Sequence, residues 1–370
     1  MKRVLGHRPR KKRAAIVTII SKNYGNRLQN YALQEVLKKL GLEVFTVPYQ
    51  SGFKDMAKER IKLVLILFLP YFRNRWIWEY FNKSYIHGAI RKPSNKFLND
   101  RYDYFIAGSD QIWNPIFWIN SKREFLTAFD QDKRIAYAAS IGLDRLPEEY
   151  LERYRHYLNG IPSISVREDK AADIIRALTG RKVPVVLDPT MLITKEEWGK
   201  VIRSCRSVGP NRYIVKYILG TKSEEYEKHM KARALEEGLE IVDLLDENGF
   251  AKRGMGPLEF VTYIANCERT YVDSFHGTVF SILFSKPFVV FERPFEEGAG
   301  LMTSRLDTLL STFRLQDRMV RTPADLKRID QACDFSGVEE ILSAKRKEAL
   351  AFLRKALEME EGEAFEDGKS

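Results

Sequence analysis

The side chains best suited to chemistry lie in one short segment, residues 271–284. An apolar run ends at Val272 and a second begins at Thr278, with His276 and Gly277 between them. This pattern predicts a strand, a sharp turn and a helix, so His276 would lie between a strand's carboxyl end and a helix's amino end. In open α/β sheets ligands bind there, and free backbone N–H groups favour an anion. The position therefore suits acid–base chemistry beside a bound anion.

A structural role is the alternative for the same segment. In that interpretation Asp273 or Ser274 caps the following helix, and His276 packs as a hydrogen-bonded polar residue. The segment alone leaves both interpretations open, so residues elsewhere in the chain must decide between them.

Three arginines add the means to bind an anion. Arginine matches carboxylate and phosphate groups with two parallel N–H donors. Arg27 opens a predicted helix, Arg167 directly follows a predicted strand, and Arg305 lies at the start of another helix. A surface salt bridge is the alternative for each. Arg167 has the strongest case, because its strand would lead into the ligand-binding crevice.

Further polar clusters follow predicted strands, at Asn23–Arg27, Ser109–Asp110 and Ser140. Strand carboxyl ends line a common crevice in this type of sheet, so these clusters are expected to converge. The sequence contains no Walker P-loop, no G-x-G-x-x-G after the first strand, no H-E-x-x-H and no G-x-S-x-G. We therefore expect no metal, no cofactor and no acyl-serine chemistry.

Alternating strands and helices must position these residues. We expect strands at Ala14–Ile20, Glu43–Val47, Tyr104–Ala107, Arg134–Ala139, Ser163–Val166, Val183–Leu187, Tyr213–Leu219, Leu239–Leu244, Thr270–Val272 and Phe288–Phe291, with helices between most of them. Such alternation is typical of parallel sheets with helices on both faces. The predicted fold is α/β, with two doubly wound Rossmann-like domains facing each other across a cleft.

Domain boundaries are predicted from changes in composition. The pattern restarts near Gly209-Pro210, and basic and acidic segments occupy the two ends. We predict a basic tail at 1–13, an N-terminal Rossmann-like domain at 14–205 with a basic aromatic insertion at 49–100, a C-terminal Rossmann-like domain at 206–335, and a helix with an acidic tail at 336–370.

The positive charge is concentrated at the N-terminus. The formal net charge is +11, and seven lysines and arginines precede Ala14 with no acidic residue before Glu35. No RNA-recognition, zinc-finger or helix-turn-helix pattern accompanies them, so we expect no nucleic acid partner. A solvated tail, or one attracted to an anionic membrane surface, is expected instead.

Cysteine and hydropathy patterns predict a cytoplasmic protein. The three cysteines are far apart, and no signal-peptide pattern is present. The apolar run Leu63–Phe72 is shorter than the ~20 residues that span a bilayer. With its basic flanks and with Trp76 and Trp78, it suits a peripheral segment resting on the inner face of the plasma membrane; a buried helix is the alternative.

Six motifs occur in a fixed order along the chain. They are Asn23-Tyr-Gly-Asn-Arg-Leu-Gln29, Ala107-Gly-Ser-Asp-Gln-Ile-Trp-Asn-Pro115, Ala136-Tyr-Ala-Ala-Ser140, Ser165-Val-Arg-Glu168, Leu187-Asp-Pro-Thr190 and Asp273-Ser-Phe-His-Gly-Thr-Val-Phe-Ser281. Together they resemble the polysaccharide pyruvyl transferase family, from about Ala14 to Asp317. The resemblance implies a glycosyltransferase-B-like fold and transfer of pyruvate from phosphoenolpyruvate onto a sugar as a ketal.

The resemblance also implies roles for individual residues. His276 would be the general acid that protonates the enol carbon, and Arg167 a catalytic residue that helps to hold the donor. The donor-binding candidates are Arg27, Ser274, Gly277, Thr278 and Arg305, and the acceptor-binding candidates are Asn23, Asp110 and Gln111. The expected partners are phosphoenolpyruvate and a cell-envelope or capsular saccharide, free or lipid-linked.

Ser274 departs from the pattern of some family members, which carry an arginine two residues before the histidine. Either Arg305 or Arg27 replaces the missing charge, or the donor differs from phosphoenolpyruvate. Two other functions are kept as alternatives. One is a nucleotide-sugar glycosyltransferase of the same fold, with Glu292 as the nucleotide-binding acid. The other is a non-catalytic membrane-associated scaffold built on the basic tail and Leu63–Phe72.

Overall fold

The computed structural model describes residues 10–47, 71–88, 94–116, 122–205, 210–221, 223–246, 254–293, 303–326 and 332–359. Nearly all of the basic tail, most of Leu63–Phe72 and the acidic end lie outside the described residues, so the predictions for them stay predictions.

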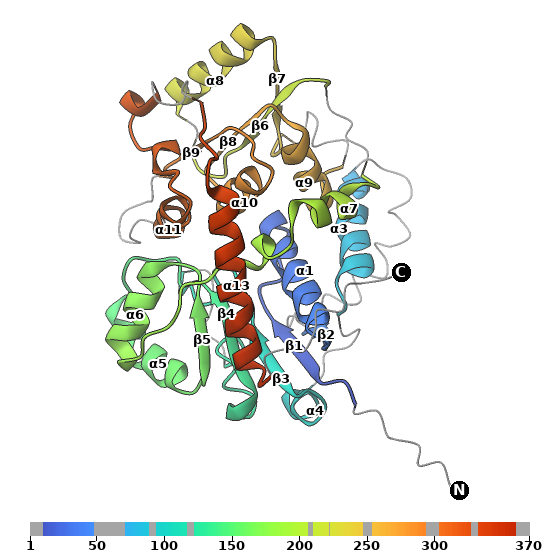
Figure 1. The fold of residues 1–370 in the computed structure, drawn as a ribbon, viewed down its shortest axis with the longest axis vertical. Coiled ribbons are helices and arrows are strands. Elements are labelled where there is room, and N and C mark those ends of the chain that lie inside the picture. Colours follow the sequence, from blue (N-terminus) through green and yellow to red (C-terminus); the bar gives the residue numbers. More distant parts are fainter. Residues whose placement is uncertain are drawn as a thin grey trace, which may run out of the picture.

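A parallel sheet forms the core of the N-terminal half (Figure 1). Its strands are β1 (Arg13–Val17), β2 (Glu43–Thr46), β3 (Tyr104–Ala107), β4 (Arg134–Ala139) and β5 (Ser163–Val166), in the order β2-β1-β3-β4-β5. All four residues of β3 are buried, as expected for a central strand covered on both faces.

The C-terminal half repeats the same topology. Its strands are β6 (Tyr213–Tyr217), β7 (Glu240–Asp243), β8 (Arg269–Val272), β9 (Phe288–Phe291) and β10 (Met319–Val320), in the order β10-β9-β8-β6-β7. In each sheet the strand order reverses at one place, between β1 and β3 and between β6 and β8. Crevices at such reversals are the usual ligand sites of doubly wound sheets.

Helices lie between the strands in the chain, and the last helix follows the last strand. They are α1 (Tyr24–Lys39), α3 (Tyr71–Tyr85), α4 (Asn95–Arg101), α5 (Glu148–Asn159), α6 (Asp169–Thr179), α7 (Lys195–Ile202), α8 (Glu224–Glu237), α9 (Pro257–Asn266), α10 (Phe275–Leu283), α11 (Ser304–Thr312) and α13 (Val338–Ala356). None of the described helices is long and apolar enough to cross a membrane.

Aromatic side chains join the two halves. Tyr24, at the start of α1, stacks on Phe260 of α9 with ring centroids 5.0 Å apart and on Trp78 of α3 at 5.3 Å. Trp78 is therefore part of the packed fold, whereas Trp76 is 56% exposed and stacks on Tyr80. This packing fixes the amino end of α1 against the C-terminal half.

The last described helix returns to the N-terminal half (Figure 1). Tyr104 of β3 donates from its hydroxyl to the carbonyl of Leu357, just after α13, at 2.7 Å. Arg346 of α13 donates to the carbonyl of Met191 at 2.7 Å. We propose that the domain boundary lies near residue 205, as predicted, with α13 as a strap across both domains.

The predicted fold class is confirmed, and one predicted strand is wrong. Residues 183–187 form a single bridge, between Val185 and Val166, in place of a strand. Pro184 has no N–H to donate, which interrupts a ladder at this edge. Conversely, three observed elements were not predicted. One is the short strand β10; the others are the helices α3 and α4, in the region expected to be an insertion.

Candidate active site

A cavity of about 350 Å³ lies in the cleft between the two halves, at the carboxyl ends of the central strands. Residues from both halves line it: Ile19, Ser21, Asn23, Asp110, Gln111, Leu219, Asp273, Ser274, Phe275, His276, Arg293, Thr303, Arg305 and Leu306. Six residues predicted from the sequence are among them, and the strand-order reversals of both sheets meet here, as the topology requires.

His276 lies in the first turn of α10, directly after β8. The N-cap of this helix is Ser274, whose hydroxyl accepts a bond of 3.4 Å from the N–H of Gly277. The imidazole is only 6% exposed. Its Nε2 faces the carboxylate of Asp188 at 3.5 Å, which places a buried acid beside the predicted general acid.

Asp188 is a site residue for which the sequence analysis predicted no role. It is 1% exposed and caps a 3₁₀ turn, where Thr190 donates to its Oδ1 from the N–H at 3.0 Å and the hydroxyl at 2.6 Å. Ser109 donates to its Oδ2 at 2.7 Å. Burial would raise the pKa of Asp188, but His276 and Arg167 hold it well below its ordinary value. The carboxylate is therefore charged.

Arg167 lies behind the cavity and does not line it. Its guanidinium is buried, donates to Asp188 at 2.8 Å and lies 3.6 Å from Asp110. It also stacks on the ring of Phe275, at 4.1 Å from the ring centroid. Burial alone would lower the pKa of Arg167, but Asp188 and Asp110 raise it. Arg167 is thus a buried cation that holds two carboxylates of the site in place.

Asp110 and Gln111 form the N-terminal wall of the cavity with Asn23. Asp110 has a φ of +75°, an uncommon left-handed conformation for a residue with a side chain. Its Oδ2 accepts a bond of 3.2 Å from Asn26. Burial would raise the pKa of Asp110, yet Arg167 and then His276 lower it. Asp110 is a charged acceptor, available to a hydroxyl group in the cavity.

Two of the predicted donor-binding residues are enclosed within α10. Gly277 is buried, and a Cβ there would lie 2.9 Å from Val272. Thr278 is fully buried and donates from its hydroxyl to the carbonyl of Ser274 at 3.0 Å. Ser274, the third donor-binding candidate in this segment, lines the cavity, whereas Gly277 and Thr278 do not. We propose that Gly277 and Thr278 shape the turn and do not contact the donor.

Arg27 also points away from the cavity. It is 2% exposed and donates to the carbonyl of Ile19 at 2.9 Å. Burial lowers the pKa of Arg27 to about 10. We propose that Arg27 supports the loop after β1 from behind, since its guanidinium is occupied by that loop.

Two other arginines face the cavity. Arg305 lies in the first turn of α11; its Nε is buried and has no hydrogen-bond partner in the described part of the chain. Burial, and then the neighbouring Arg167, lower the pKa of Arg305 to about 10. Arg293, which the sequence did not single out, follows β9 and pairs with Asp273 through Nε and Nη2, both at 3.1 Å. The guanidinium of Arg305 is available to an anion, whereas the charge of Arg293 is balanced by Asp273.

Gly25 allows the amino end of α1 to approach His276. A Cβ on Gly25 would lie 1.9 Å from Nδ1 of the imidazole, a distance that no side chain can accommodate. The contact ties the position of His276 in the C-terminal half to the Tyr-Gly-Asn turn of the N-terminal half.

Replacing Gly25 with alanine is therefore expected to displace His276 and to lower turnover by at least about tenfold, since small misplacements of a reacting group are costly. Overpacking would also destabilise the fold by about 1–3 kcal/mol. Steady-state kinetics and urea unfolding measure the two effects. Gly199→Ala, in α7 with open space around it, is the matched control. Unchanged turnover in Gly25→Ala would show that the contact is unimportant.

No group of three His, Cys, Asp or Glu side chains among the described residues is arranged to hold a metal ion. What the cavity offers is a buried histidine–carboxylate pair, two cavity-facing arginines and a charged aspartate. This set suits proton transfer on an anionic substrate.

The fold and the cleft first define a structural class, the glycosyltransferase-B-like proteins. A putative UDP-N-acetylglucosamine 2-epimerase from Listeria monocytogenes has a TM-score of 0.53 at 10% identity over 94% of this chain and 97% of its own. The UDP-N-acetylglucosamine 2-epimerase from Rickettsia bellii gives 0.50 at 11% identity, with coverages of 94% and 97%. S. aureus MnaA, solved with UDP, gives 0.50 at 10% identity, with coverages of 96% and 100%. At these identities the likeness shows the fold alone.

The family follows from the sequence match. A family model for polysaccharide pyruvyl transferase matches residues 23–293, more than half of the chain. The chain belongs to the polysaccharide pyruvyl transferase family, which is a family of enzymes. No curated protein matches the sequence significantly. Because this family consists of enzymes, the non-catalytic scaffold is not retained as an alternative.

Proposed function

We propose that the enzyme transfers pyruvate from phosphoenolpyruvate onto two hydroxyls of a cell-envelope or capsular saccharide as a ketal, with His276 as general acid. One observation carries the proposal: His276, paired with the buried Asp188 behind it, lies in the wall of a cavity that Arg305, an arginine unpaired among the described residues, also lines.

Three helix amino ends face this cavity. Asn23, Ser274 and Thr303 are the N-cap residues of α1, α10 and α11, and all three line the cavity. Each helix amino end carries about half a positive charge, and together they create a strongly anion-attracting site. A donor with both a carboxylate and a phosphate fits this environment.

Arg305 supplies a full positive charge in the same place. The Nε of Arg305 lacks a hydrogen-bond partner in the described structure, so a bound carboxylate or phosphate would satisfy it. Arg293 also lines the cavity, but Asp273 fixes its guanidinium and balances its charge. Arg305 would replace the positive charge that Ser274 does not provide.

The proposed reaction proceeds through an oxocarbenium-like centre. His276 donates a proton to the methylene carbon of phosphoenolpyruvate, which becomes a methyl group, and the positive charge develops at the adjacent carbon. One sugar hydroxyl adds there, phosphate leaves, and a second hydroxyl closes the ketal. One hydroxyl proton returns to His276 and the other leaves with phosphate, so the reaction consumes no net proton.

The remaining residues of the site have supporting roles. Asp188 faces Nε2, so it orients the imidazole and stabilises its protonated form, leaving Nδ1 for proton transfer. Arg167 positions Asp188 from behind the cavity. Asp110, with Asn23 and Gln111, would accept hydrogen bonds from the attacking hydroxyls of the saccharide.

Replacing Arg305 with glutamine is expected to raise the KM for phosphoenolpyruvate by about 10–100-fold, because a charge-assisted hydrogen bond to the donor is lost. Phosphate release in the presence of a saccharide panel measures the effect. Arg314→Gln, at an exposed position after α11, is the matched control. An unchanged KM would remove Arg305 from the donor site.

A nucleotide-sugar glycosyltransferase remains the alternative, because MnaA of the same fold was solved with UDP. Glu292, the predicted nucleotide-binding acid, is instead paired with Arg321 at 3.3 Å. A thermal-shift comparison decides between the two functions. Phosphoenolpyruvate should raise the melting temperature, and UDP or GDP sugars should not; the reverse result would favour the glycosyltransferase.

We also propose that the enzyme acts peripherally at the inner face of the plasma membrane on a lipid-linked acceptor. The support is the basic sequence before Ala14, since polybasic segments are attracted to anionic lipid. The protein should co-sediment with phosphatidylglycerol vesicles in low salt and be released in high salt. A variant lacking residues 1–9 should bind less and keep its activity; equal binding would exclude a role for the tail.

A further inference from the structure

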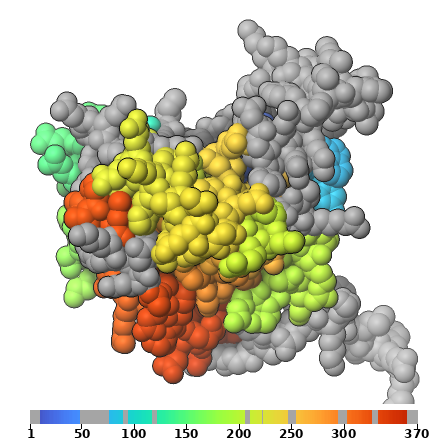
Figure 2. Space-filling model, turned by 90° about the horizontal axis from the view of Figure 1, so that it is seen from above, coloured from blue at the N-terminus to red at the C-terminus, as the bar shows by residue number. Residues whose placement is uncertain are grey.

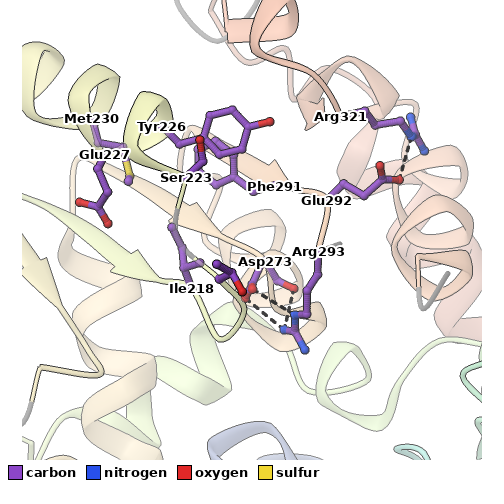
Figure 3. A pocket seen from close by; sticks show the side chains of 11 residues that line it. Ile218, Ser223, Tyr226, Glu227, Met230, Asp273, Phe291, Glu292, Arg293 and Arg321 are labelled. Atoms are coloured by element: carbon purple, nitrogen blue, oxygen red, sulfur yellow. Dashed lines mark hydrogen bonds and ion pairs between the residues drawn. The ribbon is translucent and has the colours of Figure 1, made fainter. Parts of the chain in front are cut away.

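A second cavity, of about 220 Å³, lies next to the first and within the C-terminal half. Figure 2 looks onto this half, and Figure 3 shows the residues that line the cavity. They come from the end of β6, the start of α8 and the segments after β8, β9 and β10. Asp273 and Arg293 line both cavities, so the two spaces share a wall.

One side of this second cavity is aromatic and apolar. Tyr226 of α8 stacks on Phe291 of β9, with ring centroids 4.6 Å apart and planes 24° from parallel. Ile218 and Met230 extend the apolar surface (Figure 3). Such a surface suits the flat C–H face of a sugar ring, with nearby polar groups to fix its orientation.

The other side carries carboxylates whose charges are balanced. Glu292 pairs with Arg321 at 3.3 Å, and Arg293 is held by Asp273 (Figure 3). Both arginines are thus already neutralised by protein carboxylates. The carboxylate oxygens can still accept hydrogen bonds from hydroxyl groups.

Charge also argues against a phosphate-bearing ligand here. The amino end of α8 opens onto this cavity at Ser223, the kind of position that normally attracts phosphate. Its first turn, however, contains Glu224, Glu225 and Glu227. Glu227, which lines the cavity, is balanced by Lys216 at 2.6 Å, and Glu224 and Glu225 offset the positive helix end. The described residues of the cavity therefore offer an anion no free positive charge, and the cavity favours an uncharged ligand with many hydroxyls.

We infer that the second cavity binds a neutral sugar ring of the acceptor, adjacent to the ring that receives pyruvate. The inference rests on the proposed function, which places the reacting ring beside His276. Because the two cavities adjoin at Asp273 and Arg293, a saccharide bound in the first would extend past these residues into the second. The cavity would then make the enzyme prefer acceptors of two or more rings.

Ser223→Trp tests this inference by filling the cavity. Ser223 is the N-cap of α8 but makes no side-chain cap bond, so the helix should persist. Glu225→Trp, exposed on the same helix and outside the cavity lining, is the matched control. Phosphate release is measured with single-ring and two-ring saccharides. We expect a roughly tenfold higher KM for two-ring acceptors in Ser223→Trp alone, with the KM for phosphoenolpyruvate unchanged.

The outcomes separate the two proposals. Equal KM values in both variants for two-ring acceptors would overturn the sugar subsite. If the wild type releases no phosphate with any saccharide, the proposed function fails, and saturation-transfer NMR with the same saccharides reads the subsite directly. A saccharide signal that Ser223→Trp removes supports the subsite. An equal signal in Ser223→Trp, or a signal from UDP-N-acetylglucosamine that this variant alone removes, overturns it.

Discussion

His276→Ala is expected to lower acceptor-dependent phosphate release by about 10²–10⁴-fold, the usual contribution of a general acid. Histidine is the side chain best suited to proton transfer near neutral pH, and His276 is the only histidine among the described residues that line the cavity. Without it, the methylene carbon of the donor would have to be protonated by water. The loss should appear in kcat, because the cationic groups that bind the donor remain.

The fold should survive this substitution. Asp188 keeps its bonds from Arg167, Ser109 and Thr190, so no buried carboxylate is left unpaired. The melting temperature and the phosphoenolpyruvate-induced shift should therefore stay close to those of the wild type. His156→Ala, exposed on α5, is the matched control. Undiminished activity in His276→Ala would remove this residue from the mechanism.

Most of the fold was predictable because hydrophobic patterning is local. Strands such as β3 and β9 are continuous buried runs, and their helices begin and end at recognisable residues. The strand predicted at Val183–Leu187 was wrong because an apolar run has the same pattern whether or not it pairs along its whole length. Pro184 lacks an N–H donor, so this edge segment forms only a single bridge. The two-residue strand β10 is too short to leave any pattern.

The cavity was partly predictable for a topological reason. Residues that follow central strands must meet at the carboxyl edge of the sheet, and this rule located Asn23, Asp110 and His276. The rule does not say which way a long side chain turns. Arg27 and Arg167 both follow the rule, yet their guanidiniums turn into the protein and pair with groups behind the cavity.

Asp188 was missed for a different reason. It follows no regular strand, and its Asp-Pro-Thr sequence is typical of a capped turn, which its bonds with Thr190 confirm. Its place beside His276 depends on the packing of the two halves, which no local pattern encodes. The role of Arg293 was missed for the same reason: it pairs with Asp273 on a separate loop, and no local pattern shows that these two loops meet.

Asp188→Asn should reduce both activity and stability, and the two effects can be separated. The amide has the shape of the carboxylate but no charge, and it replaces one accepting oxygen with an NH2 group, although both oxygens of Asp188 accept bonds from protein donors. It therefore holds the imidazole less well and does not stabilise its protonated form. Loss of an orienting carboxylate can cost up to about 10⁴-fold in turnover. Asp173→Asn, exposed on α6, is the matched control.

The loss of stability comes from Arg167. Its buried guanidinium would lose the charge of its 2.8 Å partner and keep only Asp110, at 3.6 Å; breaking a buried pair typically costs about 3–5 kcal/mol. The pKa of Asp188 is depressed in the folded protein, so its contribution is present above the unfolded value of about 4 and is lost as the pH falls below it. Urea unfolding should therefore show the deficit of Asp188→Asn at pH 7 and a smaller deficit near pH 3.

The double variant Arg167→Met, Asp188→Asn distinguishes positioning from structure. Removing the unpaired cation should recover part of the lost stability, because methionine has a similar length and no charge to bury. Turnover should not recover, since His276 still lacks its carboxylate. If activity returned together with stability, Asp188 would act only by holding the fold, and the proposed assignment of the His276–Asp188 pair would be wrong.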